Sequence, residues 1–96
     1  MKINCNKNGS ELIVEIEGRL DTITAPELES FLVKNYDGVD FVTFNCEKLV
    51  YVSSAGLRVL LTAHKRMLGG MKLTNVCELV MEVFEMTGFA DILVIE

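Results

Sequence analysis

Tryptophan is absent from the 96-residue chain, and proline and histidine occur once each. The three cysteines, Cys5, Cys46 and Cys77, are odd in number and far apart, which argues against a disulfide framework or a zinc site. All three lie in apolar stretches, so we expect free thiols packed in the core. His64 falls on the apolar side of a helical pattern, where a histidine more often packs than acts as a base or ligand. The sequence therefore predicts no metal and no other cofactor.

Long apolar runs are missing too. No segment is long enough to span a bilayer, and residues 1–8 lack the apolar core of a signal peptide. We therefore expect a cytoplasmic protein without membrane insertion. The net charge of −5 argues against nucleic acid as the main partner, because a phosphate backbone attracts a basic surface.

Catalytic motifs are equally scarce. Ser53 and Ser54 have no base close in sequence, and Val52 and Ala55 flank them where a nucleophile elbow would have glycines. No Gly-x-x-x-x-Gly-Lys-Ser/Thr phosphate loop occurs. We expect that the protein is not an enzyme, and a nucleotide-binding role has little support.

The composition is that of a globular protein, with 50% apolar and 24% charged residues. Ninety-six residues predict one domain, spanning residues 1–96, that buries roughly 60–65% of the surface of its unfolded chain. Nothing in the sequence demands self-association, and we expect a monomer.

The first half of the chain predicts two strands, a helix and a third strand. Alternating residues indicate antiparallel strands at 2–6 and 12–17, with Asn8-Gly9 as their hairpin turn. Thr24 to Glu27 has the pattern of a capping box with Pro26 in the first turn, opening a helix that ends at Asp37-Gly38. Residues 41–46 are apolar on both faces, which is typical of a central strand with layers on either side.

The stretch from Leu49 to Leu68 organises the rest. Val50 to Val52 are extended, and Ser53 or Ser54 is a suitable helix N-cap. Helical spacing then places one apolar face at Leu57, Leu60, Leu61, His64 and Leu68, before Gly69-Gly70 stops the helix. Two hydroxyls thus lie at the positive end of a helix, where a phosphate can be carried without damage to the fold.

A strand at 71–74, a helix over Val76 to Phe84 capped by Gly88, and a final strand at 92–95 complete the pattern. The order β-β-α-β-α-β-α-β predicts the α/β class. We expect a single domain in which helices pack on a mixed, mostly parallel β-sheet.

Four segments together resemble a known family. Gly18 to Asp21, Thr24 to Leu28, Val42 to Cys46 and Tyr51 to Leu57 have the order and spacing of a STAS domain, and the chain is most similar to the bacterial anti-sigma factor antagonists. The resemblance covers nearly the whole chain and implies a STAS-like fold.

The resemblance also implies a modification site. Alignment on Gly56-Leu57 places the family's phosphorylated serine at Ser54, with Ser53 as the alternative acceptor, because Ser53 stands where the family commonly has Asp. The implied partner-binding surface comprises Asp21, Thr22, Ser53, Ala55, Gly56 and Arg58. Plainer roles remain open: turn chemistry for Asp21 and Thr22, internal packing for Gly56, and a solvated charge for Arg58.

The function implied by the resemblance is partner switching. The unmodified protein would bind an anti-sigma factor that is also a serine kinase, and it would be released when phosphorylated. A PP2C-type phosphatase would then reset it. The alternative is a STAS regulatory or docking subunit of a transport system, such as the partner of a lipid-transport ATPase, without a phosphorylation switch.

Overall fold

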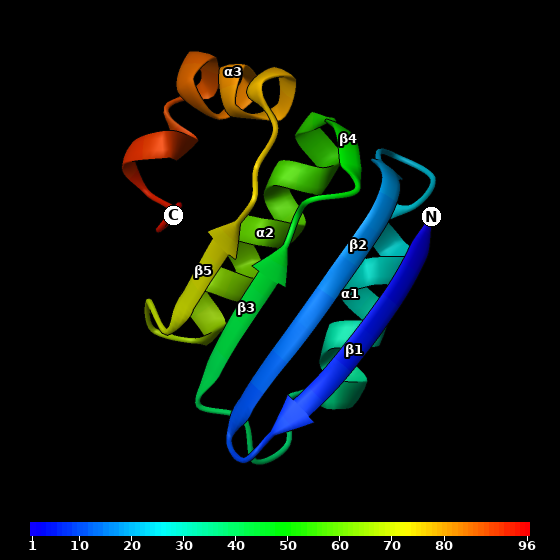
Figure 1. Cartoon of the computed structure of the whole chain (residues 1–96), viewed down its shortest axis with the longest axis vertical. Helices are drawn as coiled ribbons and strands as arrows, with labels where there is room; N and C mark the ends of the chain where they lie inside the picture. The colour runs from blue at the N-terminus through cyan, green and yellow to red at the C-terminus, as the bar shows by residue number, and fades with distance from the viewer.

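A five-stranded sheet organises the computed structural model, which describes all 96 residues (Figure 1). Its elements are β1 (Lys2–Asn8), β2 (Glu11–Leu20), α1 (Ala25–Asn35), β3 (Phe41–Asn45), β4 (Leu49–Val52), α2 (Ser54–Arg66), β5 (Met71–Thr74), α3 (Glu78–Thr87) and the 3-10 turn η1 (Phe89–Asp91). The strand order is β1-β2-β3-β5, and β4 pairs with β2. Only the β1–β2 pair is antiparallel, so the predicted mixed and mostly parallel sheet is confirmed.

The order of elements differs from the prediction at two places. β2 is ten residues long and pairs first with β3 and then, after a register shift at Gly18-Arg19, with β4. The extended segment before α2 is therefore an additional strand of the sheet, β4, which the predicted order of elements does not contain. The predicted strand at 92–95 is wrong: η1 takes up Phe89–Asp91, and a single bridge between Ile95 and Leu73 remains.

Both α1 and α2 cover the same face of the sheet (Figure 1). Alternate residues of β2 and β3, such as Val14 and Phe44, are fully buried against them. On the opposite face the Thr43 hydroxyl donates to the Glu11 carboxylate at 2.8 Å. The expectation of layers on either side of β3 is therefore wrong, because cross-strand polar contacts occupy the second face where a helix would pack.

Helix α2 ends earlier than predicted. Its last residue is Arg66, and Leu68 adopts a left-handed conformation with φ 53° and is 94% exposed. The N–H groups of Leu68 and Gly69 turn back to the carbonyls of Lys65 and His64 at 3.1 Å, which closes the helix before the two glycines. Leu68 is thus not part of the apolar face. None of the helices is long and apolar enough to cross a membrane.

The three cysteines are free thiols in different surroundings. Cys46 is buried, and burial, with a smaller effect of nearby Cys77, raises the pKa of its thiol to about 12. Cys77 is half-buried. Cys5 is exposed, contrary to the prediction, because it lies on β1, the edge strand of the sheet.

Truncation of two leucines tests this account of α2. Leu60 is fully buried, so Leu60→Ala should lower the free energy of unfolding by about 2–5 kcal/mol. Leu68→Ala removes the same atoms from an exposed site and should change it by less than about 0.5 kcal/mol. Urea denaturation measures both. A large loss of unfolding free energy in Leu68→Ala would show instead that Leu68 packs in the core.

Candidate functional site

The two serines at the start of α2 have different roles. Ser53 is extended, with φ −102° and ψ 176°, and its Oγ accepts a long hydrogen bond of 3.5 Å from the Gly56 N–H, so Ser53 is the N-cap. Ser54 is the first residue of the helix, is exposed, and its hydroxyl makes no hydrogen bond within the protein. The first turn of α2 contains no acidic residue. Ser54 therefore presents a free hydroxyl at an uncompensated positive helix end.

The loop between β2 and α1 is built on Asp21. Its carboxylate accepts hydrogen bonds from the N–H groups of Ile23 at 3.0 Å and Thr24 at 3.1 Å. The Thr24 hydroxyl accepts from the Asp21 N–H at 2.8 Å and donates to the Arg19 carbonyl at 2.7 Å. The predicted capping box of Thr24 and Glu27 is therefore wrong: Thr24 makes no side-chain cap to α1, because its hydroxyl is already engaged by the loop.

These contacts favour the ionised form of the Asp21 carboxyl group. The hydrogen bond from the Thr24 N–H is the main reason that the pKa of Asp21 lies below its usual range. The Ile23 N–H, the Thr24 hydroxyl and the Arg19 guanidinium lower it further. Arg19 Nε lies 3.6 Å from the Asp21 carboxylate, and the guanidinium lies 4.1 Å from the centre of the Tyr51 ring. Asp21 is thus an anion that orders its own loop.

The start of α2 and the Asp21 loop are joined through Leu20. The Ser53 N–H donates to the Leu20 carbonyl at 2.9 Å. Gly56 is buried against the same residue, and a Cβ at Gly56 would lie 2.7 Å from Leu20 Cγ and 2.8 Å from its carbonyl oxygen. Of the two readings of Gly56, the structure favours internal packing, since this position is closed to a partner.

The exposed part of the site is smaller than the predicted set. Thr22, Ser54 and Arg58 are exposed, and Ala55 is half-buried. Sequence reasoning missed Ile23, which is 86% exposed at the tip of the Asp21 loop. An apolar residue between two threonines in a polar loop was the available signal. The exposed residues form one candidate binding surface at the start of α2.

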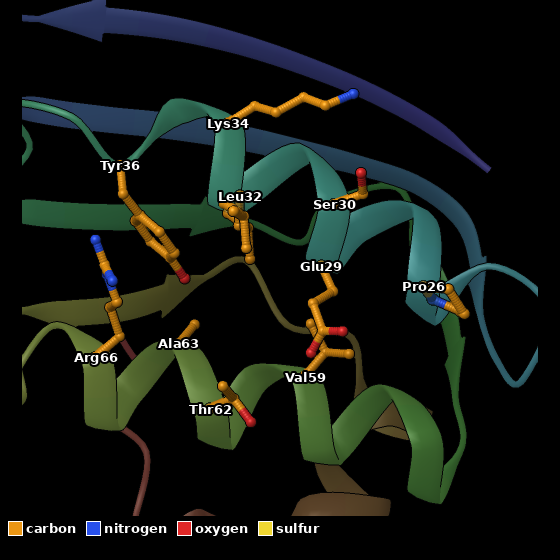
Figure 2. Close-up of a pocket in the computed structure, with 11 residues that line it drawn as sticks. Pro26, Glu29, Ser30, Leu32, Lys34, Tyr36, Val59, Thr62, Ala63 and Arg66 are labelled. Atoms are coloured by element: carbon orange, nitrogen blue, oxygen red, sulfur yellow. The ribbon is translucent and has the colours of Figure 1, made fainter.

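A groove of about 440 Å³ runs between α1 and α2 (Figure 2). Leu32 and Ala63 are among the buried side chains that line it, and the Arg66 guanidinium lies 4.6 Å from the centre of the Tyr36 ring at one end. Burial raises the pKa of Tyr36, and Arg66 offsets part of this rise. The Thr62 hydroxyl in the wall donates to the Arg58 carbonyl at 2.9 Å. The groove is lined by no histidine or cysteine, and no cluster of His, Cys, Asp or Glu in the structure could hold a metal ion.

Comparison with known proteins gives consistent results. The model of the STAS domain matches residues 2–96. The chain is 36% identical over 96 residues to BtrV of Bordetella bronchiseptica, which is named as an anti-sigma factor antagonist, covering 96% of this chain and 83% of BtrV. It is 28% identical over 96 residues to the anti-sigma-B factor antagonist of Bacillus subtilis, covering 97% and 88% of the two chains.

A solved structure extends the comparison to the fold. The unphosphorylated form of the anti-sigma factor antagonist SpoIIAA superposes with a TM-score of 0.76, at 16% identity, over 99% of this chain and 87% of that one. The phosphorylated form of SpoIIAA from Bacillus has a TM-score of 0.74, at 16% identity, over 99% and 91%. At this identity the likeness concerns the fold.

Gly56→Ala tests the contact between α2 and β2. The added methyl group meets a backbone oxygen and a buried leucine, and the overpacking outweighs the gain of about 1 kcal/mol that alanine gives in a helix. We expect a net loss of about 1–2 kcal/mol in urea denaturation. Ser54→Ala, two residues away and exposed, should change stability by less than about 0.5 kcal/mol. A stable Gly56→Ala variant would show that the contact can relax.

Acid titration tests the Asp21 loop. Because the pKa of folded Asp21 is below that of the unfolded chain, its ionised form stabilises the fold near neutral pH. This stability is lost as the pH falls through the folded pKa. Asp21→Asn should therefore lower Tm at pH 7, and the difference from wild type should shrink below about pH 4. Asp37→Asn, in an exposed turn, is the control, and an equal pattern there would assign the effect to net charge alone.

Proposed function

The chain belongs to the STAS domain family, among its anti-sigma factor antagonists, and on this premise we propose that it is a partner-switching regulator controlled by phosphorylation of Ser54. This is a regulatory family, and we propose a binding role without catalysis. The proposed partners are a kinase-type anti-sigma factor and, for the phosphorylated form, a PP2C-type phosphatase. Phosphorylated SpoIIAA shows that this fold can carry the modification.

The observation that carries the proposal is that the two serine hydroxyls have different surroundings. Ser53 caps α2, so its hydroxyl is held within the protein, whereas the Ser54 hydroxyl is exposed and unengaged. A kinase can reach Ser54 without breaking the cap. Ser53 is the alternative acceptor, but its modification would replace the hydroxyl that caps the helix.

The charge of α2 gives the switch a physical basis. Its exposed residues include Arg58, Lys65 and Arg66, and the helix contains no acidic residue. A surface of this kind favours an acidic partner. A phosphate on Ser54 adds about −1.5 to −2 charges and would be repelled by that partner. The same charge is stabilised by roughly 0.3–1 kcal/mol at a helix N-terminus, so the fold should persist.

Asp21 and the exposed Thr22 and Ile23 extend the proposed partner surface beside Ser54. The hydrogen bonds of Asp21 hold this loop, and the Leu20 carbonyl ties it to Ser53. A partner that contacts both the Asp21 loop and the start of α2 is sensitive to a charge added at Ser54. A loss of 3 kcal/mol in binding corresponds to an affinity weakened by about a hundredfold or more.

The test starts from the partner that co-purifies with the tagged chain from its native cells. With ATP, we expect that partner to place phosphate on Ser54, as read by mass spectrometry. Ser54→Ala should bind normally and resist phosphorylation. Ser54→Asp should bind at least about tenfold more weakly while its circular dichroism and Tm stay close to wild type.

Ser10→Asp is the matched control, because Ser10 is exposed in the β1–β2 turn, outside α2 and the Asp21 loop. It should leave binding unchanged. Phosphate on Ser53 alone would move the acceptor by one residue. A transporter ATPase that co-purifies and leaves both serines unmodified would replace the proposal with the docking-subunit function. A Ser54→Asp variant that loses its melting transition would contradict a switch that acts at the interface.

A further inference from the structure

Helix α3 is apolar on two faces. Val80 and Phe84 are fully buried and hold it against the domain. Leu79 and Met86 are 58% and 86% exposed, and Val83 between them is half-buried. The spacing 79, 83 and 86 places these three side chains on one outer stripe of the helix. The rest of the protein therefore leaves Leu79 and Met86, at the two ends of this stripe, largely uncovered.

Acidic residues flank the stripe. Glu78, Glu82 and Glu85 are exposed, and none forms a salt bridge. Residues 73–96 contain five acidic residues and no lysine, arginine or histidine, so this segment alone carries a charge equal to the net −5 of the whole chain. The outer side of α3 therefore combines apolar anchors at helical spacing with an unneutralised negative charge.

We propose that the outer face of α3 is a docking surface for a basic amphipathic helix of another protein. Helix-on-helix recognition uses apolar anchors at i, i+4 and i+7, and here the protein supplies this stripe. Lysine or arginine on the incoming helix would lay their alkyl stems along Leu79 and Met86 and place their charges at the glutamates. Methionine adapts its shape to such a partner at little energetic cost.

A second copy of this chain fits the surface poorly. Two α3 helices packed on each other would bring six unpaired glutamates together. The basic helix α2 offers charge, but its Leu57, Leu60 and Ala63 are buried in its own domain, so its exposed face has no anchors for Leu79 and Met86. The occupant is therefore a different, basic protein segment.

This surface is on a different helix from the proposed phosphorylation site, at the same end of the molecule. Helix α3 packs beside β4, and Ser54 follows β4 closely in the chain (Figure 1). Because a negative charge near α3 attracts a basic helix, Ser54→Asp should bind this helix at least as tightly as the wild-type protein. The surface would serve to place the regulator on a scaffold or second partner in both states of the switch.

The test uses a fluorescein-labelled synthetic peptide of leucine and lysine in an amphipathic helical order, followed by anisotropy. A second peptide of the same composition in scrambled order controls for charge. We expect micromolar binding of the first and at least tenfold weaker binding of the second. Leu79→Ser with Met86→Ser should weaken binding at least tenfold, and Glu78→Gln with Glu82→Gln and Glu85→Gln should reduce its salt dependence.

Val33→Ser with Leu68→Ser is the matched control, since these side chains are 67% and 94% exposed elsewhere on the surface. That variant should bind like wild type, and all variants should keep their Tm within a few degrees. No binding, equal binding of the scrambled peptide, or equal loss in the control variant would overturn the proposal. So would self-association in sedimentation that Leu79→Ser with Met86→Ser abolishes, because a second copy would then cover the stripe.

Discussion

The close contact between Gly56 and Leu20 sets the geometry of the proposed site. A side chain at position 56 would overlap both the side chain and the carbonyl of Leu20, so only glycine lets α2 start this near the end of β2. The same carbonyl accepts the Ser53 N–H. One residue of β2 thus fixes the direction of α2, the extended conformation of Ser53 and the position of Ser54.

The hydrogen bonds of Asp21 stabilise the loop that follows Leu20. A carboxylate with two backbone N–H donors, and Arg19 beside it, is a rigid start for α1 that does not need a cap from Thr24. For the proposed partner, this order would reduce the loss of loop entropy on binding at Thr22 and Ile23. A small chain thereby obtains a preorganised surface from two loops that share one hydrogen-bonded corner.

Most of the sheet and helices follow from local patterns, and the differences have tertiary causes. The strands with alternating residues and the helix ended by Gly88 were predictable from residues that act on their neighbours. The split of β2 between two partners depends on the whole sheet, and the exposure of Leu68 depends on a turn closed two residues before the glycines. At the site, the sequence indicates the serine pair. Which serine caps α2 is decided by the backbone angles of Ser53, and the burial of Gly56 is decided by its distance to Leu20, so neither can be predicted from the sequence.

Helices α2 and α3 carry opposite charge, and this difference follows from their composition. α2 contains basic residues and no acid, whereas α3 contains three glutamates and no base. Each helix buries one apolar face, but α3 keeps Leu79 and Met86 outside as well. A partner that recognises α2 by charge is repelled from α3, and a basic helix suited to α3 is repelled from α2. The charge pattern therefore suits two partners of opposite charge, of which the acidic one at α2 would be repelled by a phosphate on Ser54.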